Sequence, residues 1–178
     1  MTYTTSVPSP TAPPWRVDGP VPLTPHPSQA GPRPLSAPGV SWVAAHGGAG
    51  ASTLAKVLGG ADLGCHWPDV TCGHPARILL VARTDVQGLR AAARSLNAVH
   101  EGRHPAGMGL VGLVLVADLP GRLPRELRSM IRELRSKVPT WRVSWVPQWR
   151  LGRQVEQLPR HLVKLGRVVQ AAQQGGGR

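Results

Sequence analysis

Four short apolar runs, separated by segments of helical periodicity, dominate the chain from residue 40 onward. The runs cover residues 40–45, 77–83, 110–117 and 141–146. The first three are almost continuously apolar, which is typical of strands buried on both faces, and the fourth alternates. Apolar residues at three- and four-residue spacing predict helices over 52–58, 86–99, 124–138 and 155–172.

This alternation of strands and helices predicts an α/β fold. Strands that are apolar on both faces need helices above and below them, so we expect a small, mostly parallel sheet covered on both faces. Residues 62–74, between the first helix and the second strand, show no periodicity and are expected to be irregular.

The first 39 residues have a different composition, with eleven of the nineteen prolines and no apolar periodicity. Such a segment cannot bury enough apolar surface to order itself. We therefore predict a disordered Pro-rich tail over 1–39, an α/β domain over 40–173 and a flexible tail over 174–178. In the first tail, Trp15 is the candidate anchor for docking to a partner. The tail also has PxxP-like spacing at Pro10–Pro13, which chance explains better than a docking motif in a segment this rich in proline.

The charge of the 178-residue chain is strongly positive, with a formal net charge of +12. From Arg103 to Arg178, fourteen Lys and Arg face four Asp and Glu. A surplus of this size favours association with nucleic acid such as DNA, with an anionic membrane or with an acidic protein partner, through long-range attraction. A solvated arginine surface, enriched by codon usage, is the alternative. Within the helix predicted over 124–138, four basic residues share one side: Arg125, Arg128, Arg132 and Arg135.

Neither cysteine usage nor hydropathy indicates secretion or a membrane. Two cysteines are too few for a disulfide framework, and no run approaches the roughly 18–20 apolar residues of a membrane span. We expect a cytoplasmic protein without a transmembrane segment.

Four soft ligands, Cys65, His66, Cys72 and His74, cluster in the irregular segment, but their spacing departs from common zinc motifs, so incidental thiols and imidazoles are the favoured interpretation.

A glycine-rich stretch follows the first predicted strand directly and opens the first helix. It reads His46-Gly47-Gly48-Ala49-Gly50-Ala51-Ser52-Thr53. Glycines let backbone N–H groups converge, and a helix N-terminus adds partial positive charge, so this corner is suited to holding phosphate. The general motif G-x-x-x-x-G-K-[ST] also requires a lysine. Here that position is Ala51, and Ala45 stands at the first glycine.

The stretch resembles the loop of the ParA/MinD branch of P-loop ATPases, K-G-G-x-G-K-[ST]-T, at five of eight positions. His46 replaces the extra lysine of that branch. Residues 78–85, 109–117 and 143–147 are similar to its later core strands, and the loop after the last of these often borders the adenine. The whole chain is also similar to small actinobacterial, plasmid-associated P-loop-like proteins.

The resemblance implies a P-loop NTPase-like fold, ATP or another nucleotide with Mg²⁺ as ligand, compatibility with a homodimer, and an accessory or regulatory role in plasmid maintenance or transfer. The residues that it implicates in binding are His46, Gly47, Gly48, Ala49, Gly50, Ala51, Ser52, Thr53, Asp118 and Trp149.

The missing lysine argues against hydrolysis, because that charge stabilises the transferring phosphoryl group. Arg83, Arg122 and Arg150 stand near strand ends, where a guanidinium group could replace it. No Ser-His-Asp or paired-carboxylate arrangement stands out, so no catalytic residue is assigned. Two alternatives stay open: a nonenzymatic nucleic-acid or protein-interaction module with a vestigial glycine turn, and, less favoured, an ATPase with an unusual catalytic residue.

Asp118 and three tryptophans near the last predicted strand are further candidates. Asp118-Leu119-Pro120-Gly121 has the D-x-x-G spacing of a loop that senses magnesium and phosphate, but an ordinary turn explains the same residues and is favoured. Trp141 and Trp145 are expected to share the core face of the last strand with Val143. Trp149, after Pro147, is expected to stack on a base or a partner surface.

Overall fold

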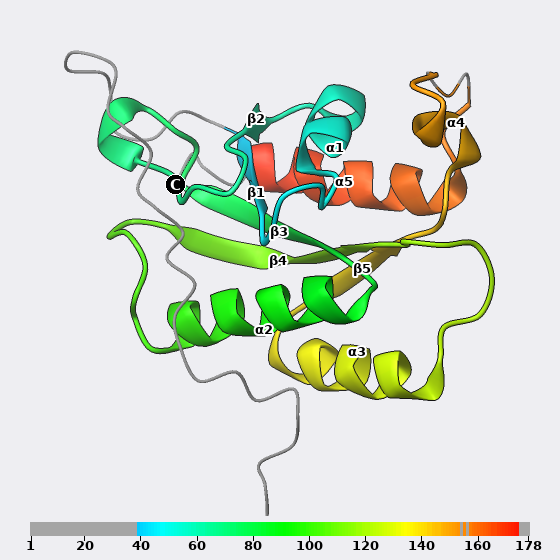
Figure 1. Cartoon of the computed structure of the whole chain (residues 1–178). Coiled ribbons are helices and arrows are strands. Elements are labelled where there is room, and N and C mark those ends of the chain that lie inside the picture. The colour runs from blue at the N-terminus through cyan, green and yellow to red at the C-terminus, as the bar shows by residue number, and fades with distance from the viewer. Residues whose placement is uncertain (1–38, 154, 156, 175–178) are drawn as a thin grey trace, which may run out of the picture.

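A five-stranded, all-parallel sheet organises the chain (Figure 1). The computed structural model describes residues 39–153, 155 and 157–174. The expected tails over 1–39 and 174–178 lie outside these residues except for Gly39 and Gln174, and so do Trp15 and Pro10–Pro13. The elements in chain order are β1 Val40–Ala44, α1 Ala51–Leu58, β2 Ala61–Asp62, the 3-10 helix η1 Val70–Cys72, β3 Arg77–Arg83, α2 Val86–His100, β4 Gly109–Val116, α3 Arg125–Lys137, β5 Thr140–Val143, α4 Pro147–Arg150 and α5 Arg160–Gln174.

Each face of the sheet carries its own hydrophobic core. Because side chains alternate along a strand, Ile78, Leu80 and Ala82 of β3 point to a core shared with α2 and α3. Leu79 and Val81 point to a second core, shared with α1 and α5. The helices therefore lie in two layers, with α2 and α3 on one side and α1 and α5 on the other (Figure 1). The predicted α/β fold is confirmed.

The strand order is β2-β1-β3-β4-β5. This 2-1-3-4-5 order is one of the two common doubly wound arrangements, in which the chain leaves β1 and β3 toward opposite faces. Ligands of such folds bind outside the carboxyl ends of the strands at that switch point. The glycine-rich loop follows β1 and Arg83 ends β3, so both lie at the switch point.

Three element predictions need correction. The segment predicted to be irregular, 62–74, begins within β2, whose residues Ala61 and Asp62 pair with Ser41 and Trp42. The last strand ends at Val143 and not at residue 146. The last helix begins at Arg160 and not near 155, because the carbonyl of Pro159 accepts hydrogen bonds from Leu162 and Val163 and so starts the helix.

No helix within the described ranges is both long enough and apolar enough to cross a bilayer.

The imidazole of His161, in α5, makes stability depend on pH. Its Nε2 atom is buried, with no hydrogen-bond partner among the described residues. Burial lowers the pKa of His161 below the usual value of 6.5. Between these two pKa values the unfolded chain binds the proton more tightly, so the free energy of unfolding rises with pH and falls on acidification.

We expect the free energy of unfolding to decrease between pH 7 and pH 5 by more in the parent than in a His161→Gln variant. Urea titrations at several pH values measure both. Equal pH profiles for parent and variant would show that His161 does not contribute.

Candidate functional site

The glycine-rich loop leaves a row of backbone donors without acceptors. Gly48 and Gly50 have φ of 76° and 101°, which only glycine adopts without strain. Gly50 is the N-cap of α1, and no side chain of a described residue caps this helix. Within the part of the chain that the structure describes, six N–H groups donate to no protein acceptor: those of Gly47, Gly48, Gly50, Ala51, Ser52 and Thr53. Such donors at a helix N-terminus favour an anion.

Arg83 fastens this loop to the end of β3. Its Nε donates to the carbonyl of Gly48 at 3.0 Å, and its backbone N–H donates to Nε2 of His46 at 3.2 Å. Nδ1 of His46 lies 2.8 Å from the carbonyl of Gly47. A neutral imidazole that is protonated on Nδ1 satisfies both contacts. His46 therefore positions the loop, and the guanidinium group of Arg83 brings a positive charge to a loop that has no lysine.

Two cavities meet at the loop. The loop cavity, of about 340 Å³, is lined by Ala44, His46, Gly47, Gly48, Ala49, Gly50, Ala51, Ser52, Thr53, Gly64, Cys65 and Arg83. The tryptophan cavity, of about 110 Å³, is lined by Gly50, Thr53, Arg83, Val116, Ala117, Ser144, Trp145, Val146, Trp149 and Arg150. They share Gly50, Thr53 and Arg83. Among the described residues, two guanidinium groups and no carboxylate line the pair of cavities, so their electrostatics favour an anion.

All eight residues predicted in the loop line the loop cavity, although not in the same way. Ala49 and Ala51 are 1% and 3% exposed and pack in the second core, so they offer the cavity mainly backbone. Ser52 is exposed, and Thr53 reaches both cavities.

Asp118 does not line either cavity. The strand that leads to Asp118 is β4, which is separated from β1 by β3, so Asp118 does not lie directly beside the loop that follows β1. Its carboxylate lies 3.7 Å from the guanidinium group of Arg83, and its backbone N–H donates to the hydroxyl of Thr84. Both side chains of this ion pair are partly exposed, so its contribution to stability is small. Asp118 thus contacts the site only through Arg83.

The tryptophans divide differently from the prediction. Trp141 is half-buried against the second core with Val143, as expected. Trp145 lies beyond the end of β5, lines the tryptophan cavity and has the Arg150 guanidinium group 5.7 Å from its ring centre. Its expected place on the core face of a strand is therefore wrong, because the strand ends two residues earlier. Trp149 lines the same cavity from α4. This helix has four residues and is too short to show a helical periodicity in the sequence.

Of the three arginines considered in place of the lysine, two reach this site. Arg83 and Arg150 line the tryptophan cavity, whereas Arg122 lies in a different hollow with Arg128 and Arg142. Sequence reasoning also missed Ser144 and Cys65 as lining residues. Burial, and secondly the nearby Asp62 carboxylate, raise the pKa of the Cys65 thiol. The signal that pointed to Arg83 was its position at the end of a buried strand.

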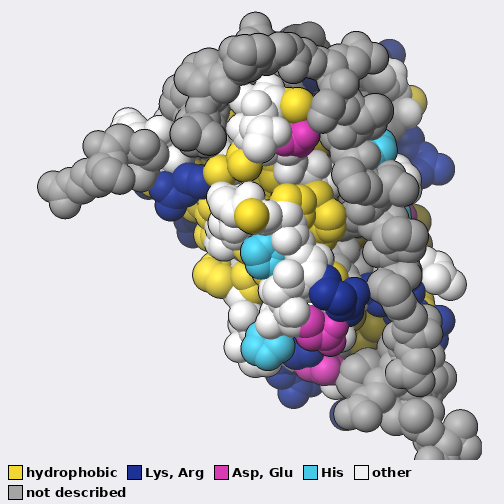
Figure 2. All heavy atoms as spheres, turned by 90° about the vertical axis from the view of Figure 1, so that its left-hand side faces the viewer, with side chains coloured by type: hydrophobic (Ala, Val, Ile, Leu, Met, Phe, Trp, Pro, Cys, Tyr) yellow, Lys and Arg dark blue, Asp and Glu magenta, His cyan; other side chains and the backbone are white. Residues whose placement is uncertain are grey.

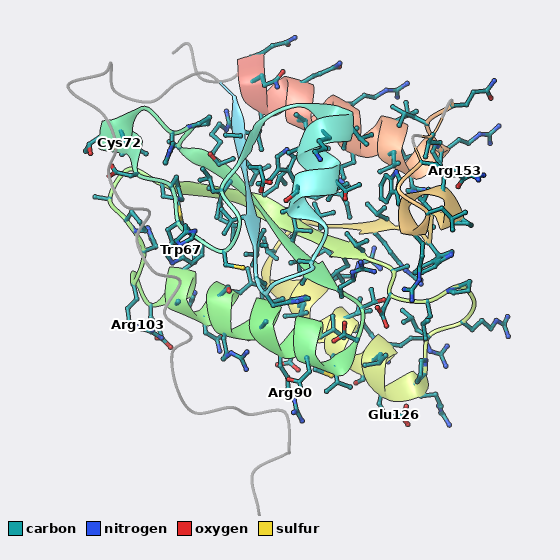
Figure 3. The ribbon with its side chains drawn as sticks, turned by 45° about the horizontal axis from the view of Figure 1, so that its top comes forward. Trp67, Cys72, Arg90, Arg103, Glu126 and Arg153 are labelled. Carbon is teal, nitrogen blue, oxygen red and sulfur yellow. The ribbon has the colours of Figure 1, made fainter. Side chains whose placement is uncertain are left out.

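The four candidate metal ligands do not form a site. Cys65 faces the loop cavity, whereas the Cys72 thiol lies 3.2 Å from Asp69 and His74 accepts a hydrogen bond from the Asp69 backbone. Across the described ranges, no group of three or more His, Cys, Asp or Glu side chains could hold a metal ion. Cys72 lies with η1 at the opposite end of the molecule from Arg153 (Figure 3). The end that carries η1 faces the viewer in Figure 2, where acidic, basic, His and apolar side chains are interspersed.

The four arginines of α3 are all exposed, as predicted, while Ile131 and Leu134 are buried on the other side of the helix. The α3 helix that carries these arginines covers the face of the sheet opposite to α1 and α5.

Compared with models of protein families, with curated proteins and with solved structures, the chain gives no match.

Proposed function

We propose that this protein binds a nucleotide, or another ligand with a terminal phosphate, at the glycine-rich loop and does not hydrolyse it. The observation that carries the proposal is the pair of cavities that Arg83 and Arg150 line. Among the described residues no carboxylate lines these cavities, and the backbone N–H groups beside them have no acceptor. The ParA/MinD-like loop extends the proposal to an accessory or regulatory role, in plasmid maintenance or transfer.

The binding half rests on complementary charge and hydrogen bonding. A phosphate at the loop would accept hydrogen bonds from the free N–H groups, and Arg83 would supply the charge that lysine supplies in complete loops. The neighbouring tryptophan cavity offers two indole rings and Ser144 to whatever group carries the phosphate. Loop, charge and aromatic surface thus meet in one place.

The absence of hydrolysis rests on what the two cavities lack. No lysine lines them among the described residues. Asp118 contacts Arg83 from outside both cavities, and the Asp62 carboxylate accepts a hydrogen bond from the backbone N–H of Gly64, a residue that lines the loop cavity. A magnesium ion in the loop cavity would find the hydroxyls of Ser52 and Thr53, but no carboxylate among the described lining residues. We therefore expect no phosphate release from ATP or GTP, and steady turnover that Arg83→Gln abolishes would contradict this half.

Calorimetric titration with ATP, ADP and GTP, with and without Mg²⁺, tests binding. We expect Arg83→Gln to weaken binding about 10- to 100-fold, because a hydrogen bond to a charged group contributes about 1.5–3 kcal/mol. Arg122→Gln, which removes the same charge from outside both cavities, is the matched control and should leave the affinity within about twofold. No heat with any nucleotide at millimolar concentration would overturn the proposal.

Alkylation of Cys65 locates the ligand. This thiol lines the loop cavity, and Cys72 does not, so Cys72 serves as the internal control. Because its pKa is raised, Cys65 should be labelled with iodoacetamide at mildly alkaline pH, and the modified peptides counted by mass spectrometry. Bound nucleotide should slow labelling of Cys65 and leave Cys72 unchanged. Equal slowing of both would place the ligand elsewhere.

A further inference from the structure

A second basic surface lies away from the loop and joins three segments of the chain. Arg125, Arg128, Ser129 and Arg132 of α3 line one open hollow, of about 560 Å³. Arg122 and Arg142, from the loop before α3 and from β5, line a neighbouring hollow of about 360 Å³ together with Arg128. We call Arg122, Arg125, Arg128, Arg132 and Arg142 the basic face. The fourth predicted arginine, Arg135, is exposed but lines neither hollow.

The charges of this face are not neutralised internally. All five arginines are exposed, and within the described residues none of them forms an ion pair. The acidic residues of α3 are Glu126 and Glu133. Glu126, labelled in Figure 3, lies in the first turn of the helix. Five guanidinium groups gathered from separate segments, without carboxylate partners, produce a field that attracts a polyanion.

We propose that the basic face binds the phosphate backbone of double-stranded DNA. Arginine presents a planar fork of donors that matches phosphate oxygens, and all five charges of the face are arginine. From Arg125 to Arg132 the helix rises about 10.5 Å, and one strand of a DNA duplex presents a phosphate for about every 3.4 Å of the duplex axis. The length and the chemistry of the face therefore suit contact with several phosphates at once.

Two other polyanionic surfaces fit less well. Membrane binding by a basic helix needs a free apolar side, but Ile131 and Leu134 of α3 are buried in the first core. Single-stranded nucleic acid is held by aromatic side chains on which bases stack, and no aromatic residue lines either hollow among the described residues. A duplex read through its backbone needs neither feature.

The test measures affinity for a fluorescent mixed-sequence DNA duplex by anisotropy at several salt concentrations. Five phosphate contacts predict a slope of log K against log salt of about −4.5, at roughly 0.9 per contact. The variant R125Q/R128Q/R132Q should bind more than tenfold more weakly at about 0.1 M salt, with a slope flatter by about 2.7.

The matched control is R160Q/K164Q/R167Q, which removes three exposed charges from α5 on the opposite side of the sheet. It should keep the parent slope. An equal loss in this variant would show that net charge alone binds DNA, and no binding by the parent at low salt would also overturn the proposal. So would polyglutamate of equal charge that competes as well as DNA, since that would favour an acidic protein partner.

Circular dichroism establishes that both triple variants fold. If the α3 triple does not fold, Arg122→Gln and Arg142→Gln test the face from the two other segments. Each should flatten the slope by about 0.9, and an unchanged slope in both would overturn the proposal. Loss of nucleotide binding at the loop would leave these expectations unaltered.

Discussion

Replacing Trp42 by alanine is expected to lower the free energy of unfolding by about 3–5 kcal/mol. The indole is fully buried in the second core, where it joins β1 to α1 and α5. Its Nε1 donates a hydrogen bond to the carbonyl of Gly59 at 2.7 Å, and Gly59 is the C-cap residue of α1. Truncation would leave a cavity and remove this hydrogen bond. Since domains of this size are stable by about 5–15 kcal/mol, the variant would lose a large part of its stability.

Urea unfolding followed by far-UV circular dichroism measures this loss, because six tryptophans complicate the fluorescence signal. Trp42→Phe retains most of the packing and removes the hydrogen bond, so its loss should be smaller. The control is Trp149→Ala, which truncates a half-buried indole at the edge of the same core. A midpoint for Trp42→Ala close to that of the parent would contradict the assigned core.

Gly88→Ala is expected to destabilise the protein by about 1–3 kcal/mol, although alanine is the better helix former. A Cβ at Gly88 would overlap the backbone carbonyl oxygen of Arg83 and lie 3.0 Å from its carbonyl carbon. Backbone atoms cannot rotate away, so α2 or the end of β3 must shift. Because Arg83 belongs to that strand end, the same change should also weaken ligand binding at the glycine-rich loop.

Gly166→Ala is the matched control, since Gly166 also lies inside a helix. A Cβ there would meet only Leu58 Cδ2, at an ordinary 3.6 Å. This variant should therefore gain up to about 1 kcal/mol from helix propensity. Thermal unfolding of the two variants should give shifts of opposite sign. Shifts of the same sign would mean that propensity, and not the close approach of α2 to β3, decides the stability.

Hydrophobic pattern was sufficient to predict most of the fold. The strand predicted over 77–83 and the helix over 86–99 agree with β3 and α2 to within one residue, because both elements bury long periodic runs. Pattern could not reveal β2, whose two residues are held by backbone pairing with β1. Nor could it reveal the register shift in β4, where Leu110 and Gly112 oppose the successive residues Ile78 and Leu79.

The candidate site was predictable where it is local and not where it depends on tertiary structure. The glycine-rich loop could be predicted because glycine positions and a helix start adjoin in sequence. The choice of Arg83 over Arg122 depends on strand order, since β3 and not β4 lies beside β1. The position of Trp145 depends on where β5 ends, which short alternation does not determine.

The brevity of the two outer strands also bears on solubility. An exposed strand edge can recruit the edge of another chain and so begin aggregation. Here β2 has two residues and β5 has four, and each exposes a charged side chain, Asp62 and Arg142 respectively. Short, charged borders give a foreign strand little backbone to pair with. The sheet is thereby protected from edge-to-edge growth into fibres, in spite of its two large apolar cores.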